Sequence, residues 1–225
     1  PSSVHAEGRQ ALAIVETARQ QVAEALGAQG ADVIFTSGAT EAAGLALTGR
    51  GIRCADIEHE AVSSWCQSDL SCGLDGGVAC QAPGATALQL ANSETGILQQ
   101  LPDGLALCDM TQAFGKLPVA FHWSGATMAL VSAHKIGGPK GVGALIVKRG
   151  TEVAAQIKGG GQEMGRRSGT ENVIGIAGFG AAAEAAQRDL ADGVWEQVEK
   201  LRNILEKAVA QSASETISCI RRTMT

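Results

Sequence analysis

Polar side chains that could do chemistry follow five apolar stretches of the sequence. They are small hydroxyls, an imidazole, two amides, a carboxylate and an amine, at Ser37–Thr40, His59, Asn92, Asp109 with Gln112, and Ser132 with His134 and Lys135. Lys135 is the most unusual, because it stands between a histidine and a run of glycines in "SAHKIGGPKG", residues 132–141. Its function depends on which of the other groups the fold brings beside it.

These groups fit different parts of one small molecule. A small hydroxyl and backbone N–H groups at a helix N-terminus bind phosphate. In a low-dielectric crevice the charged form of a lysine is disfavoured, so a nucleophilic amine becomes accessible. A buried aspartate can hold a proton on a ring nitrogen. Phosphate, ring nitrogen and aldehyde together describe pyridoxal 5'-phosphate, whose protein partners are a Schiff-base lysine and an aspartate.

The remaining polar groups fit the ring of the same cofactor. His59 would present a flat face to the ring, and Asn92 and Gln112 would hydrogen-bond its oxygen. Taken singly, each group has a simpler interpretation: "SGAT" (37–40) as a turn and helix cap, His59 as a packed or surface histidine, Lys135 as a solvated strand end. The glycines around Lys135 alone would be a turn. The cofactor site is therefore inferred from the set, not from one residue.

The spacing of apolar residues predicts strands that alternate with helices. The predicted strands are 32–36, 52–57, 78–82, 86–91, 105–109, 128–133 and 142–148, and the predicted helices are 6–27, 41–47, 59–65, 171–190 and 194–210. Thr40 is the candidate N-cap of the second helix. Such alternation predicts an α/β fold, a three-layer sandwich with a mostly parallel sheet flanked by helices. Ligands bind such sheets at the carboxyl ends of the strands, where the polar residues would meet.

Composition excludes several classes of function. The 225 residues are 45% hydrophobic, enough for a real core, and the net charge of −5 comes without any basic run, so nucleic acid is not an expected partner. Six scattered cysteines without a C-x-x-C pair argue against a zinc site and a disulfide framework. With no apolar run of about 18 residues and no signal peptide, no membrane association is expected, and a reduced cytoplasmic protein is the plain interpretation.

Seven segments carry a family resemblance and occur in the family's order from residue 1 to about residue 180. They are "PSSVHAEGR", "FTSGATEAAGLAL", "EHEAV", "NSETGILQ", "DMTQAFGKLPV", "SAHKIGGPKGVGALIVKRG" and "GGGQEMGRRSGTENVIGIAGFG". Together they resemble the cysteine desulfurases, class V aminotransferases within the fold-type I pyridoxal-phosphate enzymes. The resemblance implies a homodimer that converts L-cysteine to L-alanine. It also implies that the sulfur passes as a persulfide to an iron–sulfur scaffold or another acceptor protein.

The resemblance also implies a role for each site residue. Lys135 would form the Schiff base with the cofactor, His59 would stack on the pyridine ring, and Asp109 would pair with the ring nitrogen. The other implied contacts are the ring oxygen for Gln112 and Asn92, the phosphate for Ala39, Thr40 and Ser132, a place beside Lys135 for His134, and the neighbouring subunit's phosphate for Thr170. Lys140, the other candidate amine, would be a loop residue.

The resemblance covers only the cofactor-binding portion of the family. Residues 1–190 would form the large cofactor-binding domain, and residues 191–225 a helical segment leading to a small domain that we expect to be missing. No segment matches the family's N-terminal pocket segment, its cysteine loop or its substrate-carboxylate arginine. Cys219 and Arg221–Arg222 are weak candidates for the last two roles. Ser93 stands where the family more usually has an asparagine.

Three functions remain open from the sequence. The first is a truncated cysteine desulfurase, weak or inactive as this chain alone. The second is another class V aminotransferase or a lyase, since one fold hosts many reactions. The third is a non-catalytic cofactor-binding fragment, which the missing cysteine loop and arginine favour. Alanine and bound persulfide would indicate the first, and pyruvate or keto acids the second.

Overall fold

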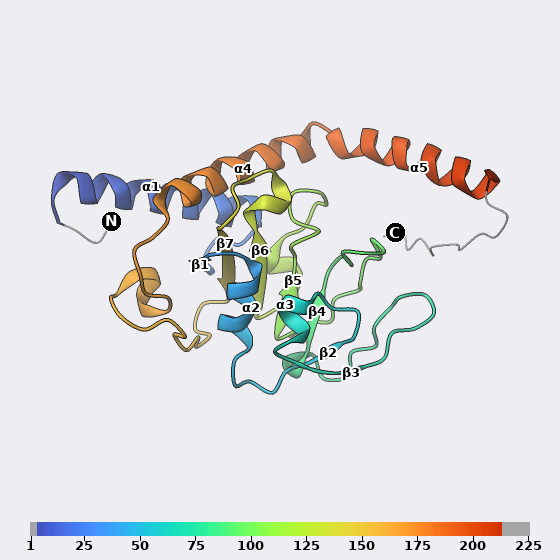
Figure 1. Cartoon of the computed structure of the whole chain (residues 1–225), viewed down its shortest axis with the longest axis horizontal. Coiled ribbons are helices and arrows are strands. Elements are labelled where there is room, and N and C mark those ends of the chain that lie inside the picture. Colours follow the sequence, from blue (N-terminus) through green and yellow to red (C-terminus); the bar gives the residue numbers. More distant parts are fainter. Residues whose placement is uncertain (1–3, 213–225) are drawn as a thin grey trace.

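The computed structural model describes residues 4–212 and has an α/β architecture (Figure 1). The central sheet has five strands, which in spatial order are β1 (Asp32–Thr36), β7 (Gly143–Val147), β6 (Met128–Ser132), β5 (Leu107–Asp109) and β4 (Ala87–Gln89). β4, β5 and β6 are parallel, and β7 runs antiparallel to both β6 and β1. The sheet is mixed but mostly parallel, which confirms the predicted fold class.

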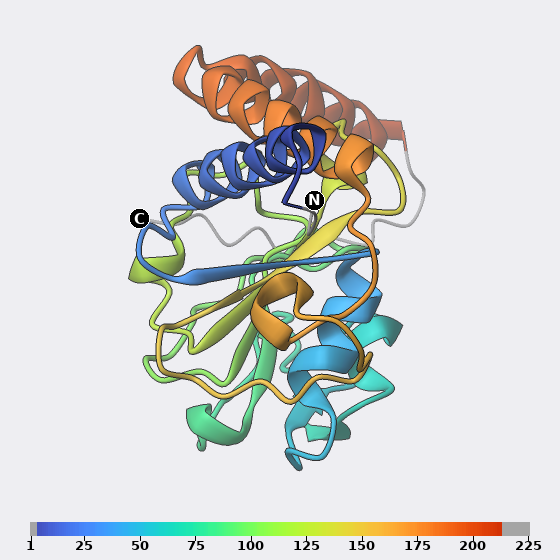
Figure 2. The same cartoon turned by 90° about the vertical axis from the view of Figure 1, so that its left-hand side faces the viewer.

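Helices cover both faces of this sheet (Figure 2). On one face α1 (Ala6–Ala25) packs against α4 (Val173–Ala191). On the other face α2 (Ala39–Leu47) contacts β6 and β7. α5 (Val194–Ser212) follows α4 and extends beyond the sheet (Figure 1). Within residues 4–212, no helix combines the length and the apolar character that crossing a membrane requires.

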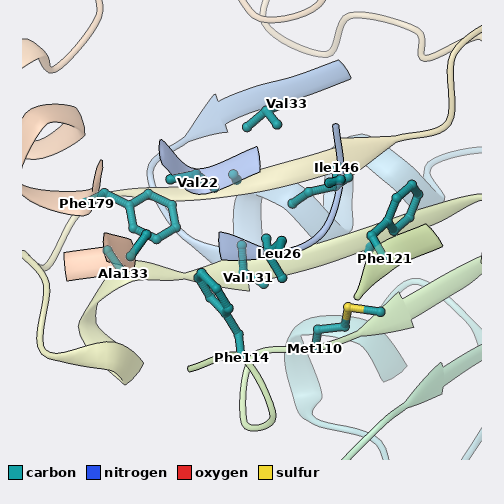
Figure 3. Close-up of a cluster of buried hydrophobic side chains, with 14 of the residues drawn as sticks. Val22, Leu26, Val33, Met110, Phe114, Phe121, Val131, Ala133, Ile146 and Phe179 are labelled. Atoms are coloured by element: carbon teal, nitrogen blue, oxygen red, sulfur yellow. The ribbon is translucent and has the colours of Figure 1, made fainter. Parts of the chain in front are cut away.

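Alternate residues of the central strands pack into two separate cores. In β6, Ala129 and Val131 belong to the core under α1 and α4, whereas Met128 and Leu130 belong to the core under α2. Figure 3 shows Val131 in the first core, into which Phe179 of α4 also projects. Because side chains alternate across a strand and both faces of the sheet are covered, the central strands carry apolar residues on both faces.

A second, two-stranded sheet lies beside the first. β2 (Arg53–Ala55) pairs in parallel with β3 (Gln67–Leu70), and the short α3 (Glu60–Ser63) lies between them in sequence. The strand predicted at 52–57 is therefore shorter and outside the central sheet. The helix predicted at 59–65 ends at Ser63. β3 was not predicted, because three of its four residues are exposed and polar and so leave no apolar alternation.

Residues 78–82 do not form the predicted strand. Only Val78 pairs, in a single bridge with Cys72, and its N–H donates to the side chain of Gln99 at 3.0 Å. A side chain thus takes the place of a neighbouring strand. Four short 3₁₀ turns complete the description, and they are η1 (Pro83–Ala85), η2 (Phe121–Trp123), η3 (Ala133–Ile136) and η4 (Gln162–Gly165).

Ion pairs hold residues 158–172 against the sheet and α2. The pairs are Arg19–Glu163 at 2.7 Å, Arg166–Asp32 at 2.7 Å and Arg167–Glu41 at 2.8 Å. The Glu163 side chain is 2% exposed and also accepts the N–H of Phe35 at 2.9 Å. Arg19 in turn donates to the carbonyl of Val33 at 2.5 Å. This long segment without regular structure is thereby fixed to the fold.

Candidate active site

A cavity of about 440 Å³ opens at the carboxyl ends of the central strands. Eight of the ten site residues predicted from the sequence line it, and they are Ala39, Thr40, His59, Asp109, Gln112, Ser132, His134 and Lys135. Its size suits a small molecule or cofactor. A larger hollow of about 740 Å³, lined in part by Arg50 and Arg166, contains none of these residues. The chemistry is therefore concentrated in the smaller cavity.

One end of the cavity is the start of α2. The N-cap residue is Gly38, which offers no side-chain cap, and Thr40 is already the second helical residue. The prediction that Thr40 caps this helix is therefore wrong. Instead, the carboxylate of Glu41 accepts the N–H of Ser37 at 2.8 Å and holds the turn before the helix. Burial raises the pKa of Glu41, but hydrogen bonds from Arg167 and Ser37 outweigh that and lower it.

The backbone around Gly38 is closely surrounded. A Cβ on Gly38 would lie 4.0 Å from the Ser132 hydroxyl, and a Cβ on Gly143 would lie 2.8 Å from the Cα of Gly38. Ser132 Oγ lies 2.9 Å from Nδ1 of His134. Since helix N-termini attract anions, the start of α2 beside the Ser132 hydroxyl fits a phosphate.

His134 and two lysines line the same side of the cavity. Burial, Lys135 and Lys140 all lower the pKa of His134, which favours its neutral form. Lys135, on η3, is exposed at the cavity, so the apolar surroundings expected around its amine are absent from the described residues. Lys140 lines the cavity as well, so geometry alone offers two amines.

Asp109 ends β5 at the base of the cavity. The cavity leaves part of the residue exposed, but the surrounding protein still raises the pKa of the carboxyl by burial. A hydrogen bond from Thr111 N at 2.8 Å and the charges of His59 and Lys135 act in the opposite direction and favour the carboxylate. An acid in this position can hold a proton on a ring nitrogen.

His59 comes from the second sheet and joins the same wall. It is the N-cap of α3, and its Nδ1 accepts the N–H of Ala61 at 3.0 Å. An acceptor nitrogen carries no proton, so the neutral ring is assigned its proton on Nε2.

Thr111 was not identified from the sequence, although it lies two residues after Asp109. It lines the cavity, and its buried hydroxyl, which makes no hydrogen bond of good geometry within residues 4–212, lies close enough to the Asp109 carboxyl to lower the pKa of that group. With the helix N-terminus, the acid and the amines, this donor set fits pyridoxal 5'-phosphate.

Gln112 is bonded through its backbone to Lys116. The backbone carbonyl of Gln112 accepts a hydrogen bond from Nζ of Lys116 at 3.2 Å. The pKa of Lys116 is lowered by burial and by the charge of Lys135. The Gln112 side chain lies in the cavity wall, as expected.

Asn92 is not among the residues that line the cavity, whereas its neighbour Ser93 is. Asn92 is buried, and its Nδ2 donates to the carbonyl of Ile57 at 3.0 Å. Its Oδ1 accepts the N–H groups of Glu94 at 2.9 Å and Thr95 at 2.8 Å. Ser93, which in the sequence is only a departure from the family pattern, was not expected in the site.

Thr170 also lies outside the cavity lining, exposed in the 158–172 segment. Its expected role concerns a neighbouring subunit, so it stays a prediction. Gln89 lines the cavity and was not identified from the sequence. Its signal is a single polar residue inside the apolar run "TALQLA". Cys219 and Arg221–Arg222 lie outside the described residues.

The chain is similar to several known proteins. The chain is 38% identical to a cysteine desulfurase of Frankia sp. (strain EuIK1), covering 98% of this chain and 64% of that protein. It therefore spans a little under two thirds of that relative's length. It superimposes on a NifS-like protein from Rickettsia africae ESF-5 with a TM-score of 0.86 and 31% identity, covering 94% of this chain and 67% of that one.

A structure titled "SspA in complex with cysteine" is also similar, with a TM-score of 0.74 and 30% identity over 82% of this chain and 64% of that one. The model of a protein family described as aminotransferase class-V matches residues 1–74 and 82–223. These segments contain every residue of the cavity wall. The chain belongs to the aminotransferase class-V family.

Proposed function

We propose that this chain is the pyridoxal 5'-phosphate-binding part of a cysteine desulfurase. One observation carries the proposal: a single cavity collects eight of the predicted residues, which follow four separate predicted strands. The similarity to a cysteine desulfurase and to a cysteine-bound structure supports the substrate class.

Different residues of the cavity wall would contact different parts of the cofactor. Lys135 would hold it covalently, Asp109 would keep a proton on the ring nitrogen, and His59 would lie against the ring. Gln112 would contact the ring oxygen, and the start of α2 with Ser132 would bind the phosphate. When bound, the cofactor supplies an electron sink for bonds at the substrate α-carbon.

The reaction would break the carbon–sulfur bond of L-cysteine. Alanine would retain the carbon skeleton, and a cysteine thiolate would accept the sulfur as a persulfide. No cysteine and no arginine line the cavity within residues 4–212. The sulfur acceptor and the substrate-carboxylate partner would therefore come from elsewhere, and the protein would act in the cytoplasm with an iron–sulfur scaffold or another acceptor protein.

We also propose the domain division expected from the sequence. Residues 1–190 would be the cofactor-binding domain, and residues 191–225 would lead to a small domain. α5 has no buried residue and touches the rest of the chain mainly at its start, where Nε1 of Trp195 donates to the carbonyl of Gly115 at 2.8 Å, which supports a boundary after α4. A homodimer, in which Thr170 would reach the neighbour's phosphate, completes the proposal.

A non-catalytic cofactor-binding module is the second candidate. It is favoured by the same lack of arginine and cysteine in the described cavity wall. It predicts cofactor binding without turnover. Another aminotransferase or lyase would instead release a keto acid.

The first experiment titrates the chain with pyridoxal 5'-phosphate and records visible absorbance and cofactor mass after borohydride reduction. We expect a reduced adduct on Lys135, its loss in Lys135→Ala, and its retention in the matched control Lys140→Ala. An adduct that survives in Lys135→Ala removes Lys135 from its proposed role.

The second experiment identifies products from L-cysteine. Alanine with protein-bound persulfide supports the desulfurase. Pyruvate or a keto acid supports the other enzyme class, and cofactor binding without product supports the non-catalytic module.

A further inference from the structure

We propose that Glu58, Gln89 and Asn92 are positioning residues that fix His59 in the wall of the cavity. The inference rests on the proposed function, in which His59 lies against the cofactor ring. It adds how the fold keeps that ring in place.

His59 needs such an anchor because it does not belong to the central sheet. It lies between β2, a strand of the small sheet, and α3, which has only four residues. Asp109, which would hold a proton on the ring nitrogen, ends a strand of the central sheet. A site built from two sheets works only if the two sheets keep a fixed position relative to each other, to within about 0.5 Å.

The first anchor joins the residues before His59 to β4. The N–H of Gln89 donates to Oε1 of Glu58 at 2.8 Å, and Nε2 of Gln89 donates to the carbonyl of Ile57 at 3.1 Å. Gln89 is paired with Asp109 in the parallel register of β4 and β5. The His59 segment is thereby bonded to the residue that stands directly beside Asp109.

The second anchor is Asn92. Its Nδ2 also donates to the Ile57 carbonyl, at 3.0 Å, so that one carbonyl accepts two side-chain amides. Its Oδ1 accepts the N–H groups of the two residues after Ser93. Asn92 therefore ties His59 to the turn that places Ser93 in the cavity. This role differs from the ring contact expected from the sequence.

The anchors are buried, so water cannot readily replace them. Glu58 and Asn92 are each 6% exposed, and Gln89 is 2% exposed. Burial, chiefly, and the nearby Asp109 raise the pKa of Glu58 to about 8. This shift favours the neutral acid near pH 7, and glutamine offers the same acceptor oxygen to the N–H of Gln89.

The test follows the ring signals of His59 by NMR in the ligand-free chain. The chain has four histidines, and His59→Ala assigns the relevant signals. We expect Glu58→Ala and Asn92→Ala to shift the His59 signals, Glu58→Gln to leave them in place, and Gln89→Leu to shift them partly. His122, whose ring bonds to the Gln29 carbonyl outside the cavity, is the internal control.

A change of stability alone would not produce this pattern. The inference is overturned if His59 signals stay in place in both alanine variants, or if His122 shifts as much as His59. Should Glu58→Ala not fold, Asn92→Ala and Gln89→Leu decide, because they act at the other two bonds.

The visible circular dichroism of bound pyridoxal 5'-phosphate provides the second readout. We expect the band to weaken in Asn92→Ala and to weaken no further when this change is added to His59→Ala. A further loss in that double variant contradicts the inference, because Asn92 would then act on the cofactor independently of His59. If the wild-type chain binds no cofactor, the proposed function fails, but the NMR result still decides the positioning role.

Discussion

α4 and α5 follow one another and have nineteen residues each, but their surroundings differ completely. α4 buries six residues, and its Gly180 lies so close to α1 that a Cβ there would come within 2.8 Å of the Ala18 Cα. α5 has no buried residue, and its Leu201, Ile204 and Leu205 are each about two thirds exposed. Both sequences show helical apolar periodicity. Periodicity thus predicts a helix and a face, but not whether a partner covers that face.

The largest effect should separate the two helices directly. Phe179 in α4 is fully buried and forms edge-to-face contacts with Phe35 and Phe114. We expect Phe179→Ala to lower the free energy of unfolding by about 3–5 kcal/mol, because it leaves a cavity. Leu201→Ala in α5 should change it by no more than about 0.5 kcal/mol. Urea unfolding measures both, and equal losses would show that α5 is covered in solution.

Ion pairs should follow the same division. Glu163→Ala leaves the partly buried Arg19 with the more exposed Glu16 as its remaining acidic partner and removes the acceptor of the Phe35 N–H, so we expect a loss of about 3 kcal/mol. Glu199→Ala removes an exposed pair with Arg202 in α5, and we expect about 0.5 kcal/mol or less. Thermal unfolding of the two variants tests this. A loss of stability in Glu163→Ala no larger than that in Glu199→Ala would contradict it.

Buried acids should make stability depend on pH. The pKa of Glu58 is raised from 4.5 to about 8 in the folded chain. As pH rises from 4.5 towards 8, the unfolded state loses this proton first, so the wild type loses stability that Glu58→Gln keeps. We expect the variant's relative stability to grow by on the order of 2 kcal/mol between pH 5 and pH 8.

Urea unfolding at several pH values measures this difference. The control is Glu199→Gln, which makes the same chemical change on the exposed α5. A flat difference for Glu58→Gln across the range would show that Glu58 is ionised in the fold.

The smallest effect on stability should come from the apolar face of α5. Replacing Leu201 and Leu205 with serine should leave the unfolding midpoint nearly unchanged, within about 0.5 kcal/mol per site. The same change should reduce binding of an apolar fluorescent dye, because it removes exposed apolar surface. Unchanged dye binding would place the exposed apolar surface elsewhere.

The sequence predicted the elements that are buried on both faces. β6 and β7 are buried along their whole length, and Ser132 and Lys135, at and just after the end of β6, line the cavity. β3 escaped prediction because its residues are exposed and polar, and 78–82 misled because a side chain, not a strand, satisfies its backbone. Local apolar patterns report burial, and they report pairing only indirectly.

The candidate site was predictable where a residue's own type does the chemistry. It was less so where contacts across the fold decide which neighbour faces the cavity. Asn92 and Ser93 are adjacent, but the Asn92 side chain bonds to the Ile57 carbonyl and to the N–H groups of the two residues after Ser93, whereas Ser93 lines the cavity. Gly38 is the cap in place of Thr40, because the helix begins two residues earlier than predicted.

The Arg19–Glu163 pair also affects whether the exposed edge of the sheet can associate with another chain. β1 is an outer strand of the central sheet, and its free side would present N–H and carbonyl groups to any extended chain that approaches. Glu163 occupies the N–H of Phe35, and Arg19 occupies the carbonyl of Val33. One ion pair therefore occupies two of the backbone groups with which an intruding strand could pair, which makes this sheet edge a poorer template for aggregation.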